Sequence, residues 1–128
     1  MYTVMTIDDE RSIRDGFKLA LEDFSELDVL EAENGLVGVE LFKKHQPDLI
    51  FLDLKMPVMN GAEALKQIRA LNPNVPIYIV TAFAKEFFEE LQTLQNQGLE
   101  FEIASKPISL LQIKQITQAA LNLHGGKA

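Results

Sequence analysis

The chain has 128 residues and a formal net charge of −7, and hydrophobic residues make up 47% of it. This length and composition are typical of one globular domain with one hydrophobic core. The negative charge disfavours direct binding to a nucleic acid, whose phosphates would be repelled over most of the surface. The absence of cysteine excludes disulfides, thiolate metal sites and cysteine-based catalysis.

Nothing in the sequence indicates secretion or membrane insertion. No apolar run approaches the ~20 residues that span a bilayer. The first ten residues lack the basic and apolar regions of a signal peptide. We therefore expect a cytoplasmic protein without a membrane partner. Residues 1–124 are expected to form the domain, and residues 125–128 a flexible tail or the start of a linker.

Strand and helix patterns alternate along the chain. Apolar β-prone runs and helical spacing of apolar residues predict, in order, strand 2–7, helix 10–24, strand 27–33, a helix from Gly35 to near Pro47, strand 48–54, helix 61–71, strand 75–82, a helix from Phe87 to Gly98, strand 99–105 and a last helix after Ser109. Ser109 and Gln112 have capping-box spacing. This alternation predicts an α/β fold of (βα)5 type, a parallel sheet with helices on both faces.

Polar side chains follow four of the predicted strands where each strand ends. They are Asp8 and Asp9, then Asp53, then Thr81, then Lys106. The carboxyl ends of parallel strands meet at one edge of the sheet, and in the flavodoxin-like order 2-1-3-4-5 the first and third strands are neighbours. We therefore expect the three carboxylates to converge, with the hydroxyl and the ammonium group facing them.

Carboxylates gathered in this way repel one another unless their pKa values rise or a cation joins them. Oxygen ligands without a nearby cysteine or histidine favour Mg²⁺, with Mn²⁺ or Ca²⁺ next. A lysine and a hydroxyl beside the ion suit the oxygens of a phosphoryl group, and an aspartate can itself attack phosphorus. The pattern thus indicates phosphoryl transfer onto an aspartate.

Four segments contain these polar residues: "TIDDE" at 6–10, "PDLIFLDLKMPVMNG" at 47–61, "PIYIVTA" at 76–82 and "SKP" at 105–107. Together they resemble the signatures of response-regulator receiver domains, including single-domain chemotaxis regulators. Their order and approximate spacing match, and the resemblance covers nearly the whole chain. It implies a flavodoxin-like three-layer sandwich and a phosphorylation-activated switch of a two-component phosphorelay.

The resemblance also implies a role for each acidic residue of the site. Asp53 would accept the phosphoryl group. Asp9 would bind Mg²⁺ directly, together with Asp53 and the backbone carbonyl of Lys55, and Asp8 would hold the ion through water. The chain would catalyse only its own phosphorylation and dephosphorylation, without turnover of an external substrate.

The same resemblance implies a mechanism of activation. Thr81 would move inward and donate its hydroxyl to a phosphoryl oxygen, Lys106 would pair with the phosphoryl group, and the bond between Lys106 and Pro107 would be cis. Receivers commonly carry Tyr or Phe three residues before this lysine, but here the residue is Ile103. Either Phe101, on the same strand face by period two, replaces the missing aromatic side chain, or the aromatic movement is absent.

Further expectations concern partners and the phosphoryl lifetime. A histidine kinase or histidine phosphotransfer protein would supply the phosphoryl group, and a downstream protein or an attached output domain would receive the signal; dimerisation on phosphorylation is one alternative. The bulky Phe83 would shield the path of the attacking water and slow self-hydrolysis. The interval from Thr81 to Lys106 is a few residues longer than usual, which predicts an extended fourth helix or a longer loop before the last strand.

Three other functions and one bland interpretation compete with this hypothesis. An FMN binder would need a glycine- and hydroxyl-rich loop where "DDERS" stands. A phosphatase resembling haloacid dehalogenases would need an acid two residues after the nucleophile, but that residue is Lys55. A degenerate receiver would lack site residues that are present here. On the bland interpretation, Asp9 only caps the helix that follows it and Asp8 is a loop charge.

Overall fold

The structure is a computed structural model that describes residues 1–123. The predicted tail at residues 125–128 lies outside the described part of the chain. The elements are, in order, β1 (Tyr2–Ile7), α1 (Arg11–Leu21), β2 (Leu27–Ala32), α2 (Gly35–His45), β3 (Leu49–Leu52), α3 (Gly61–Leu71), β4 (Ile77–Thr81), α4 (Phe88–Asn96), β5 (Glu102–Ser105) and α5 (Leu110–Leu121).

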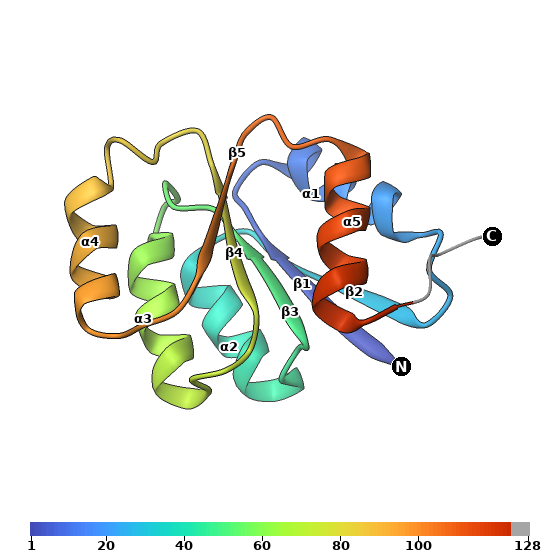
Figure 1. The fold of residues 1–128 in the computed structure, drawn as a ribbon, viewed down its shortest axis with the longest axis horizontal. Coiled ribbons are helices and arrows are strands. Elements are labelled where there is room, and N and C mark those ends of the chain that lie inside the picture. Colours follow the sequence, from blue (N-terminus) through green and yellow to red (C-terminus); the bar gives the residue numbers. More distant parts are fainter. Residues whose placement is uncertain (124–128) are drawn as a thin grey trace.

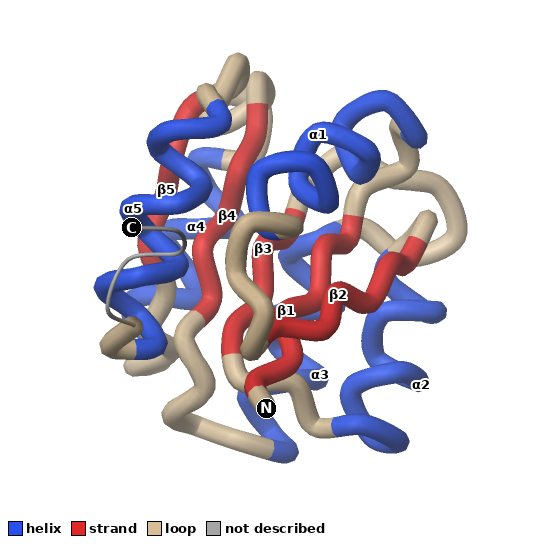
Figure 2. The backbone as a smooth tube through the Cα atoms, turned by 90° about the vertical axis from the view of Figure 1, so that its right-hand side faces the viewer, coloured by secondary structure: helices blue, strands red, loops and turns tan. Residues whose placement is uncertain are grey.

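The strands form one parallel sheet in the order β2-β1-β3-β4-β5. This confirms the predicted alternation and the predicted strand order. The sheet lies between two helical layers: α1 and α5 cover one face, and α2, α3 and α4 cover the other (Figure 1). The tube in Figure 2 shows the strands side by side across the sheet. No helix within residues 1–123 is long and apolar enough to cross a membrane.

The core is divided into two parts by the sheet. Leu52 and Ile79 belong to the cluster beneath α2, α3 and α4, and Phe51 and Val80 to the cluster beneath α1 and α5. All four residues of β3 are buried, because a central strand in a three-layer fold has helices on both faces. This burial makes the end of β3 a rigid support for the residue that follows it.

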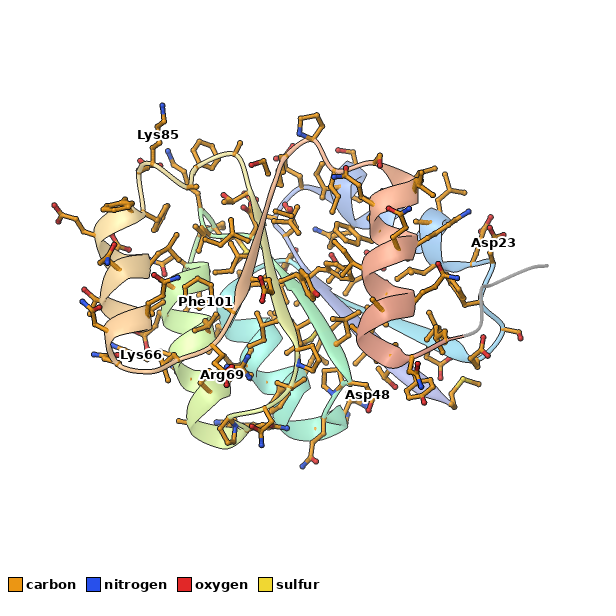
Figure 3. All side chains as sticks on the ribbon, viewed as in Figure 1. Asp23, Asp48, Lys66, Arg69, Lys85 and Phe101 are labelled. Carbon is orange, nitrogen blue, oxygen red and sulfur yellow. The ribbon has the colours of Figure 1, made fainter. Side chains whose placement is uncertain are left out.

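The last strand is shorter than its sequence pattern predicts. It begins at Glu102 rather than at residue 99, because the backbone before it has other partners. Gly98 has φ +81° and turns the chain after α4. The buried guanidinium of Arg69 then donates to the carbonyl of Glu100 at 2.9 and 2.7 Å. Phe101, near Arg69 in Figure 3, packs on the core instead of extending the strand.

The fourth helix is not extended. It has nine residues, Phe88–Asn96, so one of the two predicted explanations for the long interval before Lys106 is wrong. The residues of that interval lie instead in the connections 82–87 and 97–101. The predicted capping box at the start of α5 is confirmed, with Ser109 and Gln112 bonded reciprocally.

Candidate functional site: buried carboxylates bridged by a lysine

Asp53 directly follows β3 and lies at the carboxyl edge of the sheet. Its backbone N–H donates to the carbonyl of Ile7 at 2.9 Å, which extends the β1–β3 pairing by one residue. Its Oδ1 accepts a hydrogen bond from the N–H of Leu54 at 2.8 Å. The residue is only 2% exposed. A carboxylate so deeply buried needs a cation beside it, because an unpaired buried charge is strongly disfavoured.

Asp8 holds the corresponding position after β1. Its N–H donates to the carbonyl of Ala32 at 3.0 Å, and its Oδ1 accepts from the N–H of Glu10 at 3.0 Å. Asp8 is buried as well. Burial raises the pKa of Asp8, and the nearby charge of Asp53 adds to this, while the hydrogen bond from Lys106 offsets part of the effect.

Lys106 joins the two buried carboxylates. Its Nζ lies 2.8 Å from Oδ2 of Asp8, 3.2 Å from Oδ2 of Asp53 and 3.8 Å from Oε1 of Glu10. Burial by itself lowers the pKa of Lys106, but its hydrogen bonds and charge interactions with Asp8 and Asp53 outweigh burial, so the pKa is raised. The ammonium group therefore stays charged and balances the buried carboxylates.

Thr81 reaches the same place from the end of β4. Its carbonyl accepts from the N–H of Lys106 at 3.1 Å, and its Oγ1 accepts from the N–H of Phe83 at 3.0 Å. The hydroxyl of this buried residue still has its own proton to donate. The bond between Lys106 and Pro107 is cis, as expected.

Ile103 and Phe101 differ in their environments. Ile103 pairs with Ile79 in the β4–β5 register and is 46% exposed. Phe101 lies outside β5 and is half-buried against the core. Ile103 is also closer in register to Thr81, which pairs with Ser105. The aromatic residue is therefore part of the packed core, and the aliphatic one is at the surface.

Asp9 lies beside Asp8, and together with Glu10 they form a group of carboxylates whose oxygens lie within 4.8 Å of one another. Asp9 and Glu10 are exposed. Asp9 is not a helix cap, because the N-cap of α1 is Glu10 and no side chain caps it. An all-oxygen donor set of this kind fits a hard divalent cation such as Mg²⁺. Asp53 is outside this group and is linked to it by Lys106.

The side chain of Lys55 turns away from the carboxylates. Its Nζ lies 4.8 Å from the centre of the Phe83 ring and 3.5 Å from Oε2 of Glu86. The phosphatase hypothesis would require an acid two residues after Asp53, but this residue is Lys55. Lys55, Phe83 and Glu86 connect the loop after β3 to the loop after β4.

Three residues around the site, Glu10, Arg14 and Glu31, were not predicted from the sequence. Glu10 contributes a carboxylate to the exposed group. Arg14 donates from Nη1 to the carbonyl of Asp8 at 2.8 Å, and from Nε to Oε1 of Glu31 at 3.1 Å. Glu10 directly follows Asp8 and Asp9 in the sequence, and this position could have predicted its place in the carboxylate group. No local sequence pattern predicts the contact of Arg14 with Glu31, because Arg14 lies on α1 and Glu31 on β2.

The family model described as "Response regulator receiver domain" matches residues 4–118. The chain belongs to this family. A receiver domain is a signalling domain rather than a metabolic enzyme, and its place is in the response regulators of two-component signalling. The resemblance seen in the four sequence motifs is therefore confirmed.

Individual relatives agree with this assignment. The transcriptional regulatory protein YdfI of Bacillus subtilis is 40% identical over 87 residues, which are 67% of this chain and 40% of YdfI. The chemotaxis protein CheY of Halobacterium salinarum is 34% identical over 83 residues, 65% of this chain and 68% of that protein. The solved receiver domain of AraT from Geobacillus stearothermophilus has a TM-score of 0.76 at 26% identity, covering 94% of this chain and 93% of that one.

The chain is shorter than many of its relatives. It spans 40% of YdfI, 26% of the regulatory protein AtoC of Escherichia coli and 55% of the transcriptional regulatory protein LnrK of Bacillus subtilis. The activities and partners of those longer proteins are therefore considered only as proposals for this receiver domain.

Proposed function

We propose that this receiver domain is switched by transfer of a phosphoryl group to Asp53. The observation that supports this best is the position of Asp53 at the end of the central strand, buried, with the Lys106 ammonium 3.2 Å from its Oδ2. The ammonium group of Lys106 balances the negative charge of this buried carboxylate. The same ammonium is close enough to pair with a phosphoryl oxygen once the group is attached.

The reaction is a simple exchange of bonds at phosphorus. A carboxylate oxygen of Asp53 attacks the phosphorus of a phosphohistidine on a histidine kinase or histidine phosphotransfer protein. The new O–P bond forms as the N–P bond breaks, and the imidazole leaves with the electron pair and takes a proton from water. In the reverse switch, water attacks the phosphorus, the O–P bond breaks and inorganic phosphate leaves. The chain acts on its own aspartate and turns over no external substrate.

We propose that Mg²⁺ supports this reaction, with Mn²⁺ as a substitute. Asp9, Asp53 and the backbone carbonyl of Lys55 would hold the ion directly, and Asp8 through water. The bound ion would neutralise the charge that develops on the phosphoryl oxygens. The carboxylate group around Asp8 and Asp9 has the oxygen-only chemistry that such an ion prefers.

The phosphoryl group would be sensed by Thr81. Its hydroxyl, which accepts from the N–H of Phe83, would donate its own proton to a phosphoryl oxygen and draw the end of β4 inward. Ile103 is exposed and stands two positions before Ser105, the register partner of Thr81. It is therefore the nearer in register of the two candidate side chains to follow this movement, with Phe101 as the alternative. A downstream protein, an attached output domain or a second copy of the domain would then recognise the changed surface.

The decisive experiment is intact mass measurement after incubation with Mg²⁺ and acetyl phosphate. The wild type should gain the mass of one phosphoryl group, and Asp53→Asn should gain none. Asp48→Asn is the matched control, because Asp48 precedes β3 whereas Asp53 follows it, and it lies far from the loop that carries Lys85 (Figure 3). Within residues 1–123, its carboxylate accepts a hydrogen bond from the N–H of Thr3. No gain by the wild type, or an equal gain by Asp53→Asn, would overturn the proposal.

A further inference from the structure

The turn between β1 and α1 contains one peptide unit that both proposed metal-binding aspartates share. This unit joins Asp8 to Asp9, so its orientation decides how the two carboxylates are directed relative to each other. Nη1 of Arg14 donates to its carbonyl oxygen, the carbonyl of Asp8, at 2.8 Å. A hydrogen bond from a charged donor holds this peptide plane in one orientation.

Arg14 is itself held in place. Its Nε donates to Oε1 of Glu31 on β2 at 3.1 Å, and Nζ of Lys18 lies 2.9 Å from Oε2 of the same carboxylate. The Arg14 side chain is only 14% exposed, so the pair is partly shielded from solvent. Glu31 thus orients the planar guanidinium. Its rigidly arranged N–H groups can donate to the Glu31 carboxylate and to the Asp8 carbonyl at the same time.

The other contacts of Asp8 hold different groups: its N–H donates to the carbonyl of Ala32, and its carboxylate contacts Lys106. Helix α1 starts without a side-chain cap at Glu10. The Asp8 side chain accepts from the N–H of Glu10, but this bond orients the carboxylate rather than the peptide that follows. The Arg14 contact therefore holds the carbonyl of Asp8, which no strand-pairing hydrogen bond among the described residues holds.

We infer that Arg14, oriented by Glu31, is a positioning residue for divalent-cation binding by Asp8 and Asp9. It touches neither the ion nor the phosphoryl group, and acts through the peptide unit between the two ligands. This inference rests on the proposed Mg²⁺-dependent function. Groups that orient metal ligands from behind commonly change metal affinity about 10- to 100-fold when they are removed.

The sign of the effect separates positioning from simple electrostatics. Arg14 is a cation close to a site for another cation, so Coulomb repulsion alone predicts that Arg14→Met binds Mg²⁺ more tightly. Loss of the hydrogen bond to Asp8 predicts weaker binding. Arg11→Met is the matched control, because Arg11 stands on the same helix, carries the same charge and is 85% exposed, with Asp15 as its ion-pair partner among residues 1–123.

The experiment is calorimetric titration of the folded proteins with MgCl₂. Arg14→Met should bind Mg²⁺ about tenfold more weakly than the wild type, while Arg11→Met should bind equally or slightly more tightly. Equal or tighter binding by Arg14→Met would overturn the inference. If the wild type shows no saturable binding, the metal-dependent proposal fails and the inference fails with it. If the wild type binds Mg²⁺ and Arg14→Met binds it equally well, only the inference fails.

A second variant, Glu31→Gln, keeps Arg14 but removes the charge that orients it, so it covers the case in which Arg14→Met folds poorly. Glu31→Gln should weaken Mg²⁺ binding by a smaller factor, and in a double-mutant cycle it should have no further effect once Arg14 is removed. Full additivity of the two changes in Mg²⁺ affinity would contradict the inference that Glu31 acts through Arg14. In NMR spectra without metal, the amide signal of Asp9 should shift in Arg14→Met and not in Arg11→Met, because this N–H belongs to the peptide unit that Arg14 contacts. An unchanged Asp9 signal would also count against the inference.

Discussion

Gly61 lies directly against the backbone of Asp53. A Cβ atom at residue 61 would collide with the carbonyl oxygen of Asp53, and also approach Cα of Leu54 at 2.9 Å. The N–H of Gly61 donates to the carbonyl of Leu54 at 2.8 Å, which closes the loop between β3 and α3. Gly61 therefore helps to seat the proposed phosphoacceptor, whereas its sequence context indicated only a loop and a helix start.

Gly61→Ala should be destabilising for this reason. The obstacle is backbone rather than a flexible side chain, so we expect a loss of about 1–3 kcal/mol in the free energy of unfolding. Gly16→Ala is the control, because nothing lies within 4 Å of a Cβ at that helical position. It should be stabilising by about 0.5–1 kcal/mol. Urea unfolding measures both changes, and a Gly61→Ala protein as stable as wild type would refute the packing argument.

Asp8→Asn should stabilise the protein at neutral pH without divalent ions. The folded-state pKa of Asp8 lies above its ordinary value of 3.8, with burial as the largest cause. The favourable contribution of Asp8 is therefore complete below pH 3.8 and is lost as the pH rises through the folded-state pKa. The free energy of unfolding of the variant should exceed that of the wild type at pH 7, and the difference should vanish below pH 3.8.

Thermal and urea unfolding across this pH range test the Asp8 prediction. Asp15→Asn is a suitable control because Asp15 is half exposed on α1, and it should change stability by less than about 0.5 kcal/mol. A less stable Asp8→Asn protein at pH 7 would mean that the contact with Lys106 outweighs the cost of burying the carboxylate.

Glu31→Gln should lower stability at neutral pH but not in acid. The hydrogen bond from Lys18, followed by that from Arg14, holds the pKa of Glu31 below its ordinary value of 4.5. Its contribution is present above pH 4.5 and is lost as the pH falls through the folded-state pKa. Solvent screening limits the loss to about 0.5–1 kcal/mol at pH 7. Urea unfolding of wild type, Glu31→Gln and the exposed-site control Glu26→Gln should reveal this difference only for residue 31.

Phe83→Glu should shorten the lifetime of the phosphorylated protein. The Phe83 ring lies under the Lys55 ammonium in the loop after β4. The prediction tests the hypothesis that this large apolar group restricts the approach of water to the phosphoryl group. Replacement by a carboxylate should make loss of the phosphoryl group several-fold faster, as followed by intact mass over time. Phe88→Glu is the control, since Phe88 is a more exposed phenylalanine on α4. Equal lifetimes for Phe83→Glu and wild type would exclude a shielding role.

The local patterns of the chain were sufficient for the architecture. Apolar runs such as 49–52 identify buried strands, Ser109 with Gln112 identifies a helix start, and alternation implies a parallel sheet. The failures occurred where a distant group overrides the local pattern. Leu99 and Phe101 look like strand residues, but Arg69, 31 residues before Glu100, takes a carbonyl that a longer strand would need.

By itself, the sequence determined which chemical groups meet at the carboxyl edge of the sheet. Strand ends and chain order are local properties, and they place Asp8, Asp53, Thr81 and Lys106 together once the sheet is parallel. Only the tertiary structure decided that Lys106 bridges Asp8 and Asp53, that Gly61 supports Asp53, and that Arg14 holds the carbonyl of Asp8. These contacts depend on side-chain direction and atomic distance between segments far apart in the chain, such as the 53 residues that separate Lys106 from Asp53, and no periodicity encodes them.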